Sequence, residues 1–342
     1  MRNILITGGA GFIGSNLAKH FAAKNYKVTI FDNLSRFGAK ENIKWLKVLY
    51  PNIEIIVADI RDDDKVKKAV QNKDVILHLA GQVAVTTSVV NPRFDFEANA
   101  LGTLNVLEAA RLSGTKPIIV YASTNKVYGG MEQIKIIKKG NHYAYRDFES
   151  GIPESMNLDF HSPYGCSKGV GDQYVRDYER IYGIPTVVFR QSCIYGPRQF
   201  GVEDQGWLAW FILAITFNKP ITIYGDGMQV RDILYIDDLS KAYEMAIEKI
   251  DKARGEIYNV GGGKDHTISI WRELEPILED LFGRKIKPKF GPWRPGDQKV
   301  YISDITKIAK ELGWKPKIKV KEGIEKLYNW IYKNIKLFKN YV

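Results

Sequence analysis

Tyr164 and Lys168 form the pair of side chains with the most distinctive chemistry in this sequence. They stand four residues apart in a segment with a helical pattern, so both would lie on one helix face, one turn apart. A free tyrosine has a pKa near 10 and is a poor base at neutral pH. A neighbouring ammonium group favours the phenolate, and lowering the pKa by three units takes about 4 kcal/mol. The spacing therefore indicates a general base beside an activating lysine.

The same spacing occurs again at Tyr332 and Lys336, and position in the chain separates the two pairs. The second pair lies in a basic tail and is typical of a solvated terminal helix. The helix of Tyr164 instead follows a strand-like run that ends in Ser123 and Thr124. Ligands bind at the carboxyl ends of parallel strands, so we expect Thr124 to hold a substrate hydroxyl in line with Tyr164.

A glycine-rich turn near the start of the chain has the spacing of a dinucleotide-binding loop. The motif TGGAGFIG places Gly8, Gly11 and Gly14 between a strand-like run and a helix. The glycines allow a tight turn and close approach of a pyrophosphate, and the helix N-terminus favours the phosphate charge. Asp32, at the end of the next strand, can accept from both ribose hydroxyls and would repel a 2′-phosphate. The sequence favours NAD over NADP, although the neighbouring Arg36 leaves that choice open.

Together these residues predict a redox step on a sugar. With NAD as hydride acceptor, Tyr164 removes a hydroxyl proton while hydride leaves the same carbon. We expect Lys168 and the oxidised nicotinamide to lower the pKa of Tyr164 together, and Lys168 to bind the nicotinamide ribose as well. The predicted catalytic set is thus Thr124, Tyr164 and Lys168.

Alternating strand-like and helical segments must position these groups. The strand-like runs are continuously apolar, which suits strands buried on both faces of a parallel sheet. Their alternation with helices predicts an α/β fold with a doubly wound, Rossmann-like parallel sheet. The expected strands are Ile4–Thr7, Lys27–Asp32, Glu54–Asp59, Val75–Gly81, Pro117–Thr124 and Thr186–Gln191, and the expected helices are Phe12–Lys24, Asp62–Val70, Phe94–Ser113 and Tyr164–Tyr182.

Periodic order weakens after residue 190, where we expect a smaller, mixed C-terminal lobe for the substrate. We assign residues 1–192 and about 228–263 to an NAD-binding domain, and about 193–227 and 264–342 to a nucleotide-sugar-binding lobe. The segments predicted in this half are helices over Trp207–Phe217, Ile236–Lys249 and Ile270–Phe282 and strands over Ile221–Tyr224 and Glu256–Val260.

Composition and charge narrow the class of protein. The chain has 342 residues, 45% hydrophobic and 26% charged, which suits a globular protein with a sizeable core. Its longest apolar run, Trp207–Ile215, is shorter than the roughly 18 residues of a membrane helix, and no signal-peptide pattern opens the chain. Two cysteines cannot form a disulfide framework, so we expect a cytoplasmic protein.

The net charge of +11 comes from scattered lysines, which indicates a solvated surface and predicts neither a nucleic-acid nor a membrane partner.

From its first residue to about Trp330 the chain resembles extended short-chain dehydrogenases/reductases that act on nucleotide sugars. The resemblance rests on the glycine turn, the Tyr164/Lys168 pair, the segment YGPR (195–198) and Arg231-Asp232. It implies an NAD cofactor, contact of Asp59 with adenine, and a homo-oligomer (a dimer or a tetramer). The residues that it and the glycine turn assign to the cofactor are Gly8, Gly11, Phe12, Ile13, Gly14, Asp32, Asn33, Ser35, Arg36, Asp59, Ile60, Leu79, Ala80, Gly81, Gln82, Asn99, Ser123, Tyr164 and Lys168.

Stretches such as STNKVYGG (123–130) and LDFHSPYGCSKG (158–169) resemble the branch of this family that inverts C2 of CDP-hexoses. Dehydratases carry an acidic pair after the catalytic threonine, whereas this chain has Asn125 and Lys126, so 4,6-dehydration is not expected. The implied reaction converts CDP-paratose to CDP-tyvelose through a 2-keto sugar, with CDP-glucose to CDP-mannose as a further candidate. The expected substrate contacts are Thr124, His161, Ser192, Gln199, Gln205, Arg231 and Arg294.

Two other functions stay open on the sequence. One is a 4-epimerase of UDP-sugars, although Ser192 stands where 4-epimerases place a substrate-binding asparagine. The other is a non-catalytic NAD-binding sensor or RNA-associated module, against which the complete catalytic set argues. A metal is not expected, because the five histidines show no metal-ligand spacing. Cys166, two residues after Tyr164, would point away from the catalytic helix face.

Overall fold

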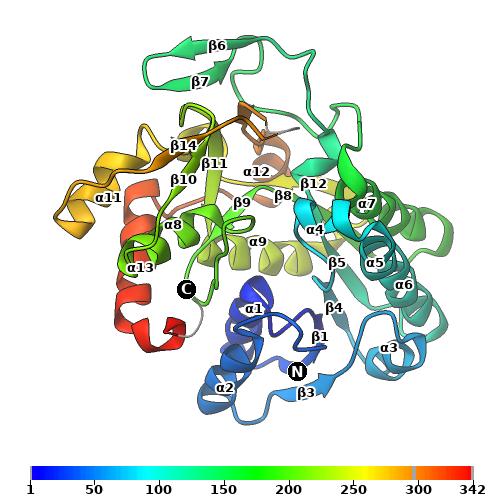
Figure 1. The fold of residues 1–342 in the computed structure, drawn as a ribbon. Helices are drawn as coiled ribbons and strands as arrows, with labels where there is room; N and C mark the ends of the chain where they lie inside the picture. Colours follow the sequence, from blue (N-terminus) through cyan, green and yellow to red (C-terminus); the bar gives the residue numbers. More distant parts are fainter. Residues whose placement is uncertain (1, 295–297, 340–342) are drawn as a thin grey trace.

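The computed structural model of the chain describes residues 2–294 and 298–339, with a seven-stranded parallel sheet at its centre (Figure 1). All neighbouring strands in this sheet run parallel. The chain changes direction across the sheet between β1 and β4, the point at which doubly wound sheets bind ligands. In spatial order the strands are β12 (Glu256–Val260), β8 (Thr186–Gln191), β5 (Ile118–Thr124), β4 (Val75–His78), β1 (Asn3–Thr7), β2 (Lys27–Asp32) and β3 (Glu54–Val57).

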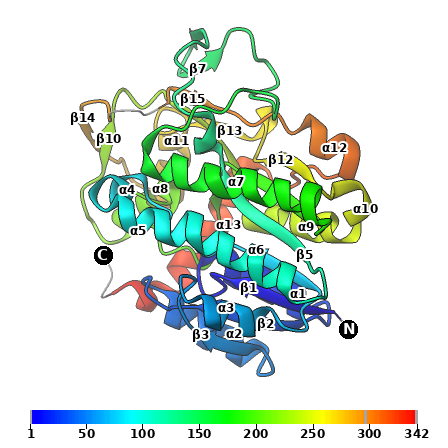
Figure 2. The same ribbon diagram turned by 90° about the vertical axis from the view of Figure 1, so that its right-hand side faces the viewer.

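Helices cover both faces of the sheet, and strand residues alternate between the two layers (Figure 1, Figure 2). Ile4 and Ile6 belong to the same core cluster as Leu17 and Phe21, whereas Leu5 belongs to the cluster on the other face. This alternation explains why the strands are apolar throughout. One layer contains α1 (Phe12–Ala22), α2 (Ala39–Leu49) and α9 (Ile236–Glu248), and the other contains α3 (Asp63–Val70), α6 (Gly102–Leu112) and α7 (Ser162–Tyr182).

The doubly wound α/β prediction is confirmed, with two strands ending earlier than expected. The predicted runs 54–59 and 75–81 stop at Val57 and His78. Asp59 and residues 79–81 therefore lie in loops that follow the carboxyl ends of β3 and β4. Loops at that edge are where a doubly wound sheet carries its ligand contacts.

The predicted single helix over 94–113 is interrupted in the structure. It consists of α5 (Pro92–Phe96), a π-helical turn (Glu97–Leu101) and α6, and it follows the short α4 (Val85–Val90). The side chain of Asn91 caps α5 by accepting a hydrogen bond from the backbone N–H of Phe94 at 3.1 Å. π-turns within α-helices are rare and often occur at functional sites, and this one carries Asn99.

The second lobe combines helices with short strands, and a hairpin projects from it at the top of Figure 1. Within the predicted 228–263 segment the chain crosses between the two sheets, because β11 pairs in the small sheet and β12 in the large one. The small sheet contains β9 (Cys193–Tyr195), β11 (Val230–Tyr235), β13 (Thr267–Ser269) and β15 (Val300–Tyr301); β10 (Thr222–Tyr224) pairs with β14 (Lys289–Gly291), and the hairpin is β6 (Ile136–Lys139) with β7 (His142–Tyr145). The remaining α-helices are α8 (Trp207–Thr216), α10 (Ile250–Ala253), α11 (Leu274–Phe282), α12 (Thr306–Leu312) and α13 (Val320–Lys333).

Among the residues that the structure describes, no helix has both the length and the apolar character that a membrane crossing requires.

A buried ion pair fixes α7 on the sheet. Arg190 of β8 donates from Nε and Nη2 to the two carboxylate oxygens of Asp172 of α7, at 2.9 and 2.8 Å. Both side chains are almost fully buried, and Ser123 of β5 donates to the same carboxylate at 2.7 Å. The pair thus connects the strand that ends in Thr124 to the helix that carries Tyr164 and Lys168.

We expect Arg190→Ala to lower the free energy of unfolding by about 3–5 kcal/mol, because it leaves the buried Asp172 carboxylate without a counter-charge. Arg146→Ala is the matched control, since Arg146 makes the same two-point contact with Asp147 on the surface. That variant should keep a nearly wild-type urea midpoint. Equal midpoints for the two variants would contradict a structural role of the buried pair.

Candidate active site

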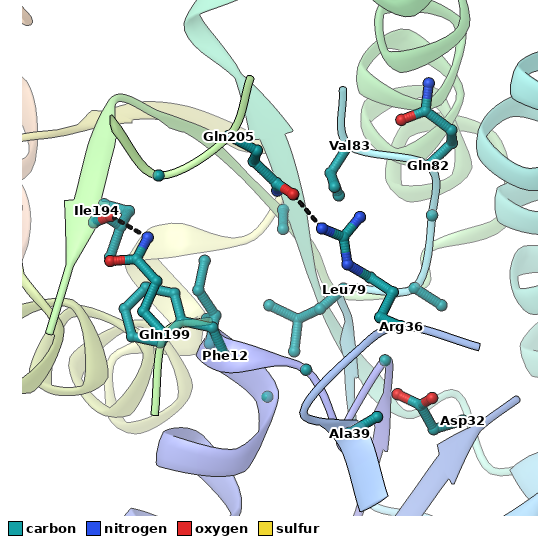
Figure 3. A pocket seen from close by; sticks show the side chains of 18 of the residues that line it. Phe12, Asp32, Arg36, Ala39, Leu79, Gln82, Val83, Ile194, Gln199 and Gln205 are labelled. Carbon is teal, nitrogen blue, oxygen red and sulfur yellow. Dashed lines mark hydrogen bonds between the residues drawn. The ribbon is translucent and has the colours of Figure 1, made fainter. Parts of the chain in front are cut away.

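A cavity of about 520 Å³ opens where β1, β2, β4 and β5 end, with the second lobe forming its far wall. Its volume lies within the range of about 300–1,000 Å³ typical of small-molecule and cofactor sites. Figure 3 shows Asp32 at the end of its strand, with Gln205 on the opposite side of the cavity and Gln199 beside Phe12. The cavity therefore lies between the two lobes at the predicted edge of the sheet.

The glycine turn closely approaches the segment after β4, which leaves no room for side chains. Gly8 has φ +70°, and a Cβ there would lie 2.8 Å from the backbone N of Ala80. A Cβ on Gly14 would lie 2.2 Å from the carbonyl oxygen of Gly8. Gly11 begins α1 without a side-chain cap, so the first N–H groups of the helix face the cavity edge. This backbone cradle fits a pyrophosphate of the predicted NAD.

Asp32 and Asp59 stand at the ends of β2 and β3, on the same side of the cavity. Asp32 accepts hydrogen bonds from the backbone N–H groups of Ala10 at 3.0 Å and Leu34 at 2.8 Å. Burial raises its pKa, and these donors oppose the rise. Arg61 donates to both oxygens of Asp59, at 2.9 and 3.1 Å, and holds the pKa of that carboxyl well below its usual range. Both carboxylates line the cavity, and their contacts with an adenosine stay predictions.

Thr124, Tyr164 and Lys168 come together at the inner end of the cavity, where β5 meets the first turns of α7. Burial raises the pKa of Tyr164 to about 12, and a hydrogen bond with Thr124 opposes this rise. We expected Lys168 to lower the pKa of Tyr164, but burial lowers the pKa of Lys168 itself to about 7. Within the protein alone, burial therefore outweighs the charges that favour the phenolate, and the positive charge of a bound, oxidised nicotinamide would have to add to them.

The far wall of the cavity connects to the cofactor side through a direct contact. Arg36, in the loop after β2, donates from Nη2 to Oε1 of Gln205, in the loop before α8 (Figure 3). A residue predicted for the cofactor thus contacts one predicted for the substrate. Gln199 donates to the carbonyl of Ile194 at 3.3 Å, and its buried Oε1 has no hydrogen-bond partner among the described groups.

Four of the predicted site residues lie outside the cavity lining. Asn99 is buried behind it, His161 is exposed at the start of α7, and Arg231 is buried on β11 with Nη1 donating to the carbonyl of Val230. Arg294 lies over the ring of Tyr224 at 3.9 Å. All other predicted cofactor and substrate residues line the cavity, and their roles stay predictions.

The second Tyr-x-x-x-Lys pair and Cys166 lie away from the cavity lining. Tyr332 is exposed on α13, and Lys336 lies beyond the end of that helix. Cys166 is exposed on α7, as its position two residues after Tyr164 predicts.

Sequence reasoning missed several residues of the site, of which Arg198 is the clearest case. Its φ of +70° is unusual for a side-chain-bearing residue, and its guanidinium is buried. It donates to Asn42 Oδ1 at 2.7 Å and to the carbonyl of Glu41 at 2.8 Å, and lies 4.8 Å from the ring of Trp45. Asn42 in turn donates to the carbonyl of Ala10 in the glycine turn. The YGPR segment signalled Arg198 in the sequence, but not its contacts with α2.

Comparison with known proteins agrees with this geometry. Residues 5–327 match the family model described as GDP-mannose 4,6 dehydratase. The chain is 46% identical to the CDP-paratose 2-epimerase of Salmonella typhi, over 96% of this chain and 98% of that protein. It is 37% identical to a putative UDP-glucose 4-epimerase of Methanocaldococcus jannaschii, over 97% and 99% of the two chains. A dTDP-glucose 4,6-dehydratase of Streptomyces venezuelae, solved with NAD bound, superposes with a TM-score of 0.85 at 29% identity, over 99% of each chain.

We expect Gly14→Ala to lower NAD binding at least tenfold, because the added Cβ collides with the carbonyl of Gly8 and displaces the phosphate turn. NAD released from the purified protein on denaturation measures this, together with calorimetric titration. Gly140→Ala in the β6–β7 turn is the control, since its Cβ meets nothing within 4 Å. Wild-type NAD content in Gly14→Ala would contradict the assignment of the turn.

Proposed function

Since this chain belongs to the extended short-chain dehydrogenase/reductase family of nucleotide-sugar epimerases and dehydratases, we propose that it is an NAD-dependent epimerase inverting C2 of a CDP-hexose. One observation carries the proposal. Tyr164 and Thr124 meet at the inner end of a cavity whose opposite side is the glycine turn, and no carboxylate follows Thr124. The 46% identity to a CDP-paratose 2-epimerase supports the substrate class.

In the proposed reaction NAD, when bound, accepts the hydride of sugar C2 and later returns it. Thr124 holds the 2-hydroxyl in line, and the phenolic oxygen of Tyr164 takes its proton. Lys168 stabilises the phenolate during that transfer. The resulting 2-keto sugar turns within the cavity, and Tyr164 gives the proton back to the C2 oxygen once the opposite face has received the hydride. C2 is inverted, with no net oxidation or reduction of the sugar over the cycle.

The residues after Thr124 separate this reaction from dehydration. Elimination of water needs an acid and a base near the sugar, and dehydratases of the family place an acidic pair there. Here Asn125 accepts from the Thr124 hydroxyl at 3.4 Å, and Lys126 donates to Gln298 at 3.3 Å. An amide and an ammonium group cannot supply a carboxylate base, which favours a reaction that only moves a proton and a hydride.

Turning of the keto sugar requires that the nucleotide stays bound meanwhile. We propose that Arg231 and Arg294 hold its diphosphate, a task that suits the guanidinium fork. Arg294 lies 3.2 Å from Asp204 and over the ring of Tyr224, so it is already oriented by the second lobe. Binding energy at the diphosphate and base keeps the intermediate near the site of hydride return.

A UDP-sugar 4-epimerase is the second candidate, favoured by the 37% identity to a putative UDP-glucose 4-epimerase. Both reactions use the same proton and hydride chemistry at different sugar carbons. Which carbon faces Tyr164 depends on how the sugar is held, so the product decides between them. A non-catalytic NAD-binding module is the third possibility, and any turnover excludes it.

We expect CDP-paratose, and CDP-glucose as a further candidate, to give products inverted at C2, identified by proton NMR of the sugar. UDP-glucose should not yield a C4-inverted product; its appearance as the main reaction would overturn the proposal. Tyr164→Phe should lower kcat at least 100-fold while NAD stays bound, because only the base is removed. Tyr332→Phe, at the exposed tyrosine of the second Tyr-x-x-x-Lys pair, is the matched control and should turn over normally.

We further propose that the chain forms a homo-oligomer through the outer face of α6 and α7. Leu112 of α6 and Tyr174, Ile181 and Tyr182 of α7 are all exposed, although apolar or aromatic. Such a face is suited to burial against a second copy. Light scattering should give two or four times the mass of the chain, and a monomer mass would reject the assembly.

A further inference from the structure

Behind the catalytic helix lies a buried carboxylate that the reaction above does not use. Asp95 of α5 is fully buried and accepts three hydrogen bonds. Gln82 and Asn99 donate their amide N–H groups to Oδ1, both at 3.1 Å, and Ser167 donates its hydroxyl to Oδ2 at 2.5 Å. These donors come from the loop after β4, from the π-turn and from α7. Asp95 thus connects the three segments that enclose the inner end of the cavity.

The donors of Asp95 are the neighbours of the site residues. Ser167 stands directly before Lys168, and its hydroxyl also lies 3.2 Å from the carbonyl oxygen of Tyr164. Gln82 lines the cavity. The amide of Asn99 donates to both Asp95 and Ser167, which leaves its Oδ1 turned toward Gly81, where a Cβ would lie 2.3 Å away. Loss of the Asp95 carboxylate would therefore remove hydrogen bonds that hold Gln82 at the cavity wall and Ser167 on α7.

Lys168 has few sources of negative charge within its buried surroundings. Its Nζ lies 4.2 Å from the ring centroid of Tyr121, and the charges that favour its ammonium form are those of Asp172 and Asp95. The charge of Asp172 is matched by the two-point contact with Arg190. The three donors of Asp95 are neutral, so none of them offsets its charge. Burial raises the pKa of this carboxyl, and the hydrogen bond from Ser167 and the charge of Lys168 oppose that rise.

We propose that Asp95 is a positioning residue of this site, a buried charge that favours the ammonium form of Lys168, opposes the phenolate form of Tyr164 and, through Ser167, fixes the first turns of α7. The inference deepens the proposed epimerase function and rests on it, because this one carboxylate acts on the charges of both Lys168 and Tyr164. It assigns a role to a side chain one helical turn before Asn99 that touches neither cofactor nor substrate.

The sign of its effect follows from the groups that face Lys168. Asp95 comes from α5, Asp172 and Tyr164 from α7, Tyr121 from β5 and His78 from β4. Burial lowers the pKa of His78 to about 3 and raises that of Tyr121, so both stay neutral near pH 7. Removing the negative charge of Asp95 lowers the pKa of Lys168, because that charge stabilises the ammonium form. It also lowers the pKa of Tyr164, whose phenolate meets less repulsion.

The test is a pH titration of Tyr164 in the purified holoenzyme, followed by NMR of tyrosines labelled with carbon-13 at Cζ. The Tyr164 signal is assigned as the one that is missing in Tyr164→Phe. In Asp95→Asn the midpoint should fall by about one pH unit. Ser167→Ala removes the hydrogen bond from Ser167 to Asp95 but keeps the charge of Asp95. The Tyr164 midpoint of this variant should therefore stay at the wild-type value. Asp95→Glu, which restores the charge, should return it.

An unchanged or raised midpoint in Asp95→Asn, or an equal shift in Ser167→Ala, would overturn the proposal. Asp95→Ser supplies a second neutral variant if the asparagine variant does not fold, with folding checked by circular dichroism. In the pH profile of kcat/KM both limbs should move toward acid in Asp95→Asn, whereas a purely structural defect lowers the rate without moving them.

The titration needs no substrate, so this test and that of the proposed function fail separately. Absence of C2 inversion rejects the epimerase and leaves the role of Asp95 to be judged by the Tyr164 midpoint. An active C2 epimerase with an unmoved midpoint rejects the role of Asp95 alone.

Discussion

Burial of Lys168 lowers the pKa of its ammonium group to about 7, and a neutral amine at that position could not stabilise a tyrosinate. The same burial raises the pKa of Tyr164 to about 12. Exclusion of water strengthens each charge interaction in the site, but it also disfavours the charges that the chemistry needs. The carboxylates of Asp172 and Asp95 favour the cation of Lys168, and the positive charge of a bound nicotinamide would favour the phenolate of Tyr164.

The parallel sheet makes this arrangement possible because it brings strand ends from distant parts of the chain to one edge. The glycine turn follows β1, residues 79–82 follow β4, and Thr124 ends β5, so cofactor and base approach one another without long loops. The second lobe adds the opposite wall, and the contact of Arg36 with Gln205 joins the two sides. The reacting sugar is expected to lie between these walls, where water is limited.

Members of this family share the tyrosine and lysine but differ in what surrounds the sugar. From the resemblance we expect Asn125 and Lys126 to stand where dehydratases carry an acidic pair. We likewise expect Ser192, which donates to Asp232, to stand where 4-epimerases bind substrate with an asparagine. On the proposed function, small changes next to an unchanged base would select the outcome of the same hydride chemistry.

The sequence alone determined the elements that depend on local pattern. Apolar strands, the glycine turn, Asp32 and the Tyr164/Lys168 spacing were all legible, because strand and helix periodicity and glycine geometry act over a few residues. Only the tertiary structure decided the rest: the π-turn that carries Asn99, the buried Arg198, the charge network of Asp95 and the direction of the Tyr164 pKa shift. These features arise from burial and from contacts between residues up to about 150 positions apart in the chain, as between Arg198 and Asn42. Local sequence does not encode how much water such contacts exclude, and that exclusion sets the charge of each group in the site.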